Sequence, residues 1–424
     1  MPLRFTKTFT AMALVSSFVL VILYSFLNMP VTHSRREAVE TPSVTNISPA
    51  RAPTTATTSE KRSSTQPVFS TTAVPLVTIS EAFIKNIPKN SAFWNRKFHS
   101  LVKELAITGG HPARHTGCRP QTTESLRMNI QDFNSYPELY QEFLAGMDCR
   151  SPPIIIDQPD KCAPVSGTKQ ILLFALKSTP GHFERRQAVR ETWGKEEVYG
   201  ESLIVKTVFL LGQTSGDDPN LDKLLTFEAQ EFKDLLLWDF QDSFYNLTLK
   251  EHVFFKWALY RCPNVSFIFK GDDDVFANTP AIFNYLQSLD ADKASKLYTG
   301  QIISDASPLR DVKIKYYVPE SFYEGPYPSY AGGGGFLFSG QLLKSVYLIS
   351  QYIPFFPIDD VYTGMCFKAL GIAPEKHIGF QTFDIREQDR ENACVHKGLL
   401  LVHRRNPQQT KRLWRNIHSP LLTC

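Results

Sequence analysis

The sequence predicts an α/β fold in which helices cover both faces of a mostly parallel sheet. Short apolar runs typical of buried strands occur at residues 171–176, 205–211, 235–238 and 266–269. Segments with helical patterns alternate with them, at residues 183–193, 221–232 and 247–260. This alternation indicates parallel strand pairs joined by helices. Ligands of such sheets bind beyond the carboxyl ends of the strands, so we expect the functional site there.

Composition excludes two broad classes of protein. Of the 424 residues, 42% are hydrophobic and 21% are charged, which rules out a wholly disordered chain. The 46 basic and 42 acidic residues are nearly balanced, so no nucleic-acid partner is expected. The strand–helix alternation falls in a predicted α/β domain, residues 166–424. Residues 81–165 have a mixed pattern and are predicted to form an N-terminal luminal subregion packed on that domain.

The N-terminal region predicts a membrane anchor. No Asp, Glu, Lys or Arg occurs from Thr8 to Thr32, and a helix needs about 17–25 mainly apolar residues to cross a bilayer. Residues 11–29 are therefore a predicted signal-anchor and residues 1–10 a cytoplasmic tail. A cleaved signal peptide is the alternative, but its apolar core is shorter, and residues 28–30 offer no convincing cleavage site.

Residues 30–80 are predicted to be a disordered stem, because Ser, Thr and Pro are abundant and apolar side chains are few. N-glycosylation sequons begin at Asn46, Asn246 and Asn264. We expect Asn46 and Asn246 to be modified more readily, since Asn264 follows a proline close to a buried-looking strand.

The seven cysteines include no CxxC pair, which disfavours zinc ribbons and thioredoxin-type chemistry. In a luminal protein they predict up to three disulfides and one remaining thiol. The spacing leaves the pairing open.

Three consecutive aspartates, Asp272 to Asp274, follow the apolar run at 266–269. Adjacent carboxylates repel one another unless a cation is present. Asp272 and Asp274 point to the same side of an extended backbone, as two ligands of a hard divalent ion would. Such an ion can bridge the oxygens of a diphosphate. A solvated acidic turn is the alternative, but the apolar residues on both sides disfavour it.

Other segments could complete a site for a sugar diphosphate. The loop at 177–181 opens a helix that carries Arg185, Arg186 and Arg190, and a helix N-terminus attracts phosphate. A solvated basic face is the alternative for these arginines. The glycines at 332–335 follow Tyr330 and would let a sugar lie against bare backbone, unless they form a tight turn.

A second acidic pair, Asp359 and Asp360, lies in an apolar context that suits a general base. The alternative for Asp359 is the N-cap of a helix at 360–370. His403 follows a short apolar strand and is a candidate metal ligand or a structural histidine.

These motifs resemble those of the β-1,3-glycosyltransferases of glycosyltransferase family 31, especially the β-1,3-N-acetylglucosaminyltransferases that extend poly-N-acetyllactosamine. The resemblance covers residues 92–424. Its ordered motifs are RRQAVRETWG (185–194), VFLLGQ (208–213), NLTLKE (246–251), FIFKGDDDVF (267–276), YAGGGGFLFSG (330–340), PIDDVYTGMC (357–366) and EKHIGFQTFDI (375–385).

The resemblance implies a GT-A fold, a UDP-sugar donor, bound Mn²⁺ or Mg²⁺, inversion at the anomeric carbon, and residence in the Golgi membrane. It implies Asp360 as the catalytic base, with Asp274, Asp272 and His403 at the metal. The implied donor contacts are Lys270, Asp272, Asp273, Arg186 and Arg190. Beside these, the predicted acceptor or sugar pocket comprises Tyr330, Gly333, Gly334 and Asp359.

The expected reaction is transfer of GlcNAc from UDP-GlcNAc to the 3-hydroxyl of a terminal galactose. A β-1,3-galactosyltransferase using UDP-Gal is the nearest alternative, and a non-catalytic luminal chaperone or lectin is an alternative of another class. A metal-dependent phosphodiesterase is disfavoured because no multi-histidine ligand set is apparent. A homo-oligomer or a complex with other Golgi glycosyltransferases is a possible assembly.

Overall fold

The structure is a computed structural model, and it describes residues 76–111, 118, 120–163, 169–200, 202–214, 216 and 218–424. The predicted tail, anchor and Asn46 lie outside the described residues, as does most of the predicted stem. Within the described ranges, no helix is both long enough and apolar enough to cross a membrane.

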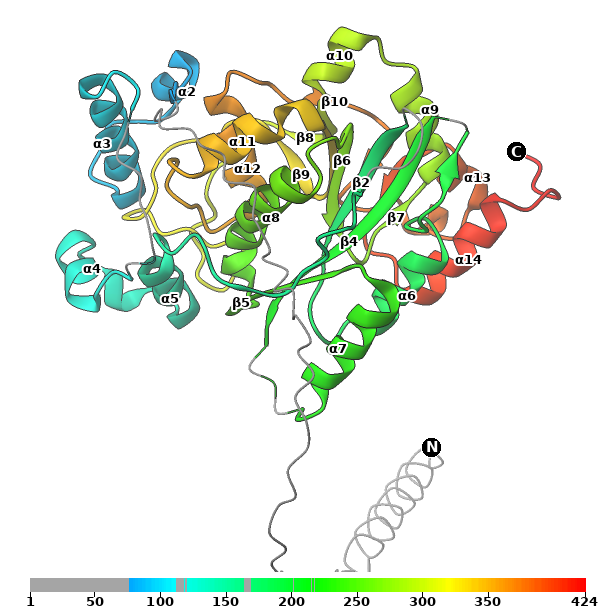
Figure 1. The fold of residues 1–424 in the computed structure, drawn as a ribbon. Coiled ribbons are helices and arrows are strands. Elements are labelled where there is room, and N and C mark those ends of the chain that lie inside the picture. Colours follow the sequence, from blue (N-terminus) through cyan, green and yellow to red (C-terminus); the bar gives the residue numbers. More distant parts are fainter. Residues whose placement is uncertain are drawn as a thin grey trace, which may run out of the picture. The chain divides into compact units, whose positions relative to one another are not determined.

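A nine-stranded mixed sheet forms the centre of the fold (Figure 1). Its middle strands are parallel and correspond to the predicted ones, in the order β5 (Leu235–Gln241), β4 (Leu203–Gln213), β2 (Gln170–Lys177) and β6 (Phe267–Asp272). Antiparallel neighbours and a further edge strand flank them: β1 (Ile154–Ile156), β3 (Val198–Tyr199), β9 (Tyr330–Ser339), β8 (Tyr298–Ile303) and β10 (Glu375–Lys376).

The expectation of a mostly parallel sheet is therefore corrected to a mixed one. Four strand pairs are parallel and four are antiparallel. The physical reason lies in the connections, because a parallel pair needs a long crossover whereas an antiparallel strand can return directly. β9 returns antiparallel to both β6 and β8, so this half of the sheet loses the repeating strand–helix pattern.

Helices cover both faces of the sheet, as predicted. Leu172, Phe174 and Leu176 of β2 share a core with α6 (Phe183–Glu191) and α7 (Leu221–Phe232). The alternate residues of β2 pack on the opposite side, with α8 (Leu247–Arg261) and α11 (Leu343–Ser350). The other helices after β6 are α9 (Thr279–Gln287), α10 (Ala291–Lys296), α12 (Asp359–Ala369), α13 (Ala393–Lys397) and α14 (Pro407–Ile417).

The N-terminal helices share a core with residues from the later part of the chain. They are α2 (Glu81–Asn86), α3 (Phe93–Ile107), α4 (Thr123–Asn129) and α5 (Glu138–Gly146), drawn in blue and cyan in Figure 1. Trp94 and Tyr140 are fully buried there, and their rings contact Phe322, Tyr323 and Phe356 from the later part of the chain. These helices thus pack on the later part of the chain through aromatic contacts, whereas β1 of the predicted subregion joins the central sheet, so the division at residue 165 stays a prediction.

A small second sheet sets one side of the site. Its order is β11 (Phe380–Gln381), β12 (Leu401–Val402) and β7 (Phe276–Ala277). β12 runs antiparallel to β7, with Val402 opposite Phe276. This register brings the residue that follows Val402 close to the aspartates that precede Phe276.

The predicted three disulfides and one remaining thiol are confirmed. The disulfides are Cys118–Cys149, Cys162–Cys262 and Cys394–Cys424, and Cys366 is a buried free thiol. Of the sequons within the described residues, Asn264 is exposed, whereas Asn246 is partly buried and donates a hydrogen bond from Nδ2 to the carbonyl of Gln241 (2.9 Å).

Loss of the Cys162–Cys262 disulfide should destabilise the fold more than loss of Cys394–Cys424. The first closes a loop of 100 residues and the second a loop of 30, so the loop-entropy difference is about 1 kcal/mol. We expect the C162S/C262S double variant to unfold at lower denaturant than C394S/C424S. Equal midpoints, with equal dependence on denaturant, would contradict this ranking.

Candidate active site

A cavity of about 940 Å³ opens at the carboxyl ends of β2 and β6, where the topology predicts a ligand. β9, the start of α12 and residues 382–404 complete its wall. Among its lining residues are Lys177, Asp272, Asp273, Asp274, Tyr330, Gly333, Gly334, Asp359, Asp360 and His403. Nine of the residues predicted for the site therefore line a single cavity.

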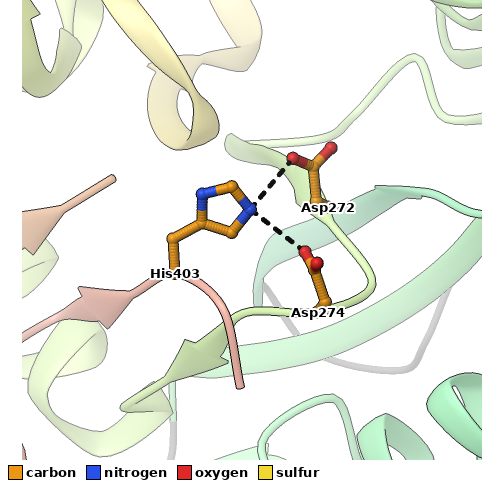
Figure 2. Close-up of side chains that lie close together, drawn as sticks. All are labelled: Asp272, Asp274 and His403. Atoms are coloured by element: carbon orange, nitrogen blue, oxygen red, sulfur yellow. Dashed lines mark hydrogen bonds and ion pairs between the residues drawn. The ribbon is translucent and has the colours of Figure 1, made fainter. Parts of the chain in front are cut away.

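Asp272, Asp274 and His403 form a compact cluster (Figure 2). One ligand atom from each lies within 4.8 Å of the others. His403 Nε2 is 3.1 Å from Asp274 Oδ1 and 3.6 Å from Asp272 Oδ2. Asp272 ends β6 and His403 follows β12. The cluster therefore brings together residues up to about 130 positions apart, such as Asp274 and His403, which are separated by 129.

The donor atoms of this cluster fit a divalent cation. His403 Nδ1 lies 2.9 Å from the carbonyl oxygen of Thr382, so Nδ1 must donate and Nε2 can offer its lone pair to a metal. Burial disfavours the imidazolium, but the hydrogen bond to Asp274 and the charge of Asp272 outweigh it and raise the pKa of His403. A cation in the cluster would replace this proton as the partner of both carboxylates.

Lys177 is a site residue that the sequence interpretation missed. Its ammonium group, at the end of β2, lies 2.7 Å from Asp359 Oδ2 and 3.1 Å from Asp272 Oδ1. It also donates to the carbonyl of Gly333 at 3.3 Å. Although burial opposes its charge, Asp272 and Asp359 hold the pKa of Lys177 well above its usual value. In the sequence, Lys177 is a single lysine after an apolar strand, and nothing in that pattern indicates which carboxylates it would pair with.

The structure decides between the alternatives for Asp359. α12 begins at Asp359 itself, and the N-cap position belongs to Ile358, so the capping interpretation was wrong. The Asp359 carboxylate instead binds Lys177. Burial opposes ionisation of this carboxyl, but the charge of Lys177 outweighs burial and lowers the pKa of Asp359.

Asp360 differs from its neighbour in electrostatics. Gly333 N–H donates to Asp360 Oδ2 at 3.0 Å and Val361 N–H to Oδ1 at 2.8 Å. Burial and the negative charge of Asp359 together raise the pKa of Asp360 to about 7. A carboxyl that titrates near neutral pH, held by two backbone amides and facing a cavity, is suited to accept a proton.

The four glycines lie within strand β9, so the tight-turn alternative was wrong. A Cβ atom at Gly333 would lie 3.2 Å from Asp360 Oδ2, and one at Gly334 would lie 3.1 Å from His403 Nδ1. A side chain at either glycine would therefore crowd Asp360 or His403. Tyr330, at the start of β9, lines the same cavity.

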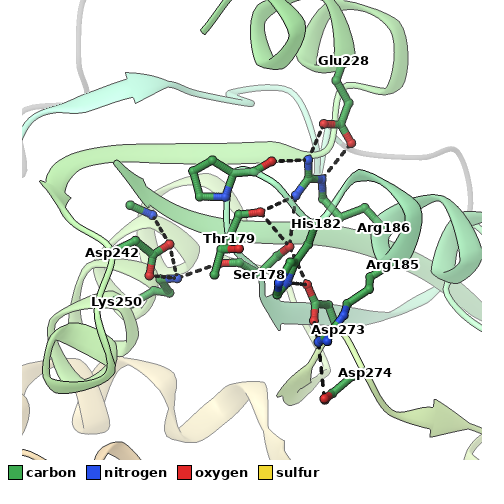
Figure 3. Close-up of polar contacts among 12 residues, drawn as sticks. Ser178, Thr179, His182, Arg185, Arg186, Glu228, Asp242, Lys250, Asp273 and Asp274 are labelled. Atoms are coloured by element: carbon green, nitrogen blue, oxygen red, sulfur yellow. Dashed lines mark hydrogen bonds and ion pairs between the residues drawn. The ribbon is translucent and has the colours of Figure 1, made fainter. Parts of the chain in front are cut away.

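The predicted arginines separate into two sets, and Figure 3 shows one member of each, Arg186 and Arg185. Arg186 is buried against Glu228, with a 2.7 Å ion pair, and Arg190 pairs with Glu228 and Asp234. Neither is among the residues that line the cavity. Arg185 does line it, and its NH1 lies 3.1 Å from Asp273 Oδ1 and 3.3 Å from Asp274 Oδ2. The helix places Arg186 and Arg190 on one face, four residues apart, and Arg185 on another.

Two more predicted residues have supporting positions. Asp273 is 6% exposed, and its carboxylate accepts hydrogen bonds from Ser178 Oγ (2.7 Å) and Arg185, with His182 Nδ1 at 2.8 Å (Figure 3). Lys270 is fully buried and lies 3.2 Å from Glu251, outside the cavity wall. Asp273 thus holds the first strand–helix loop, and Lys270 lies in the layer behind the site.

Comparisons with known proteins identify the family of this chain. Residues 184–377 match the family model described as Galactosyltransferase. N-acetyllactosaminide beta-1,3-N-acetylglucosaminyltransferase 2 of Mus musculus is 45% identical over 359 residues, which cover 81% of this chain and 89% of that protein. The Homo sapiens protein of the same name is 44% identical with the same coverage. UDP-GlcNAc:betaGal beta-1,3-N-acetylglucosaminyltransferase 8 of Mus musculus is 42% identical and covers 80% of this chain and 84% of that protein.

The motifs on which the sequence resemblance rests lie on a mixed sheet with helices on both faces. Identity above 40% over most of both chains exceeds what a shared fold alone would produce. The chain belongs to the galactosyltransferase family, glycosyltransferase family 31.

Proposed function

We propose that this protein transfers GlcNAc from UDP-GlcNAc to the 3-hydroxyl of a terminal galactose, as in extension of poly-N-acetyllactosamine. The observation that carries the proposal is one cavity containing both the Asp272–Asp274–His403 cluster and Asp360. The sugar specificity is supported by the names of the relatives, which specify β-1,3 transfer of N-acetylglucosamine.

Asp360 is the proposed general base of a single displacement. It takes the proton of the acceptor hydroxyl while that oxygen bonds to the anomeric carbon and the bond from this carbon to UDP breaks. The amides of Gly333 and Val361 orient its carboxylate, and each oxygen keeps a lone pair for the proton. Lys177 pairs with Asp359 and lowers the pKa of Asp360, which partly offsets the repulsion from the Asp359 carboxylate.

Asp272, Asp274 and His403 are the proposed ligands of Mn²⁺ or Mg²⁺. When bound there, such an ion would neutralise charge on the diphosphate of UDP. On the protein side, Asp273 and Arg185 shape the loop between β2 and α6 that faces the donor. Because Lys270, Arg186 and Arg190 lie off the cavity wall, we propose direct donor contacts for Arg185 and Asp272 and supporting positions for the other three.

A type II protein of the Golgi membrane, with the catalytic domain in the lumen, is the proposed setting. The disulfides support an oxidising compartment, and the apolar segment at 11–29 supports the anchor. A galactosyl donor is the second candidate, because the matching family model is described as Galactosyltransferase. A purely non-catalytic role is disfavoured by a complete base and metal cluster in one cavity.

The donor assay tests the proposed reaction directly. The luminal part of the chain is incubated with Mn²⁺ and UDP-GlcNAc or UDP-Gal, each offered with galactose-ended and GlcNAc-ended acceptors. We expect GlcNAc on galactose in a β1-3 linkage, identified by NMR of the product. Transfer from UDP-Gal alone would move the protein to the galactosyl branch, and no transfer by folded protein would support the non-catalytic alternative.

Asp360→Asn should lower kcat by about 10²–10⁴-fold, since this is the usual contribution of a positioned base. Affinity for UDP with Mn²⁺ should be unchanged in calorimetry. Asp160→Asn, at an exposed position, is the matched control.

The base acts only when ionised, so wild-type kcat should rise with pH through about 7 and level off above it. If the residual kcat of Asp360→Asn still rises with pH through about 7, Asp360 is excluded as the base.

Removing the metal should abolish transfer, and Mn²⁺ should restore it. His403→Ala should weaken Mn²⁺ binding by about 10–100-fold, measured by the electron paramagnetic resonance signal of free Mn²⁺. His377→Ala, a half-buried histidine away from the cluster, is the control. Equal Mn²⁺ affinity in wild type and His403→Ala would remove His403 from the ligand set.

A further inference from the structure

Arg404 combines a strained backbone with a position in the cavity wall. It directly follows His403 and has φ +61°, in the left-handed region that non-glycine residues seldom adopt. It is exposed and lines the cavity. Strained residues persist only where the surrounding structure holds them, and they concentrate at functional sites.

The neighbouring Arg405 holds this bend in place. It is 1% exposed, and its NH1 donates to Asp384 Oδ1 (2.9 Å) and to the carbonyls of His403 (3.1 Å) and Arg404 (3.0 Å). Its backbone N–H donates to the carbonyl of Asp274 at 2.7 Å. Hydrogen bonds from Arg405 therefore hold the bend to Asp274 and to Asp384.

Arg404 also differs from the other cations of the cavity. Lys177, Lys250 and Arg185 are held by carboxylates, at distances of 2.7–3.3 Å, and the ammonium group of Lys315 lies over the rings of Phe244 and Tyr316. Within the part of the chain that the structure describes, no hydrogen bond or ion pair engages the Arg404 guanidinium. An arginine whose fork of donors is free beside a metal cluster is matched to phosphate oxygens.

We propose that Arg404 binds the diphosphate of the UDP donor and stabilises the charge that develops as UDP leaves. When the bond between the anomeric carbon and the β-phosphate oxygen breaks, its electron pair stays on that oxygen. Arg404 donates hydrogen bonds to the diphosphate and gives up no proton. The proposal rests on the proposed function, which supplies the UDP donor.

The strain at Arg404 provides a sharp test. Glycine adopts positive φ freely, so Arg404→Gly removes the charge and also relieves the backbone. We expect this variant to melt at the wild-type temperature or above it, to bind UDP with Mn²⁺ about 10–100-fold more weakly, and to lose a similar factor in kcat. Arg404→Asn, which tolerates this backbone, is the second variant, and Arg404→Lys should retain part of the UDP affinity.

Lys233→Gly is the matched control. Lys233 has φ 52° at the end of α7 and is exposed outside the cavity wall, so glycine relieves similar strain there. We expect Lys233→Gly to match or exceed the wild-type melting temperature, with unchanged UDP affinity and kcat. This comparison separates backbone relief from loss of the Arg404 side chain.

Mn²⁺ binding without UDP distinguishes a diphosphate contact from an effect through His403. The proposal requires Arg404→Gly to bind Mn²⁺ like wild type. A parallel loss of Mn²⁺ affinity would make Arg404 a positioning residue for His403 and overturn the assignment, as would unchanged UDP affinity.

A wild type that binds UDP but transfers neither sugar contradicts the proposed function. In that case the UDP affinities of the variants still decide the role of Arg404. A wild type that fails to bind UDP overturns the role of Arg404 as well.

Discussion

The buried ammonium group of Lys177 is the interaction on which the site depends. β2 and β6 are in register so that Lys177 lies opposite Asp272, and the same nitrogen reaches Asp359 at the start of α12. It also binds the carbonyl of Gly333, whose amide donates to Asp360. One cation thus joins Asp272, the glycine strand β9 and the start of α12, which carries the proposed base Asp360. Removing a single partner from such a buried group leaves an uncompensated charge, which is usually strongly destabilising.

The charges around Lys177 also set the chemistry of Asp360. Lys177 holds Asp359 ionised, and the ionised Asp359 in turn raises the pKa of Asp360. Behind them, Lys270 and Glu251 form a fully buried pair, in which burial lowers the pKa of the lysine and raises that of the glutamate. Two adjacent aspartates therefore acquire different protonation behaviour because only one of them has a cation within hydrogen-bonding distance.

Backbone geometry is the second constraint on the site. The glycines of β9 let Asp360 and His403 come within contact distance of the strand, where a β-carbon would press against them. Directly after His403, the left-handed bend at Arg404 turns the chain from β12 toward α14. The cavity is thus shaped by main-chain features as much as by its charged side chains.

The sequence by itself determined the central strands and helices, the Asp272/Asp274 pair, the candidate base and the count of disulfides, because each is written in a local pattern or a composition. Only the tertiary structure decided that Lys177 and Arg185 face the cavity while Arg186, Arg190 and Lys270 are held in buried or partly buried ion pairs. Tertiary contacts also made Asp359 the partner of Lys177 and selected the three cysteine pairs. The physical reason is that these contacts join residues as far as 182 positions apart, and no periodicity within one segment can specify a partner in another.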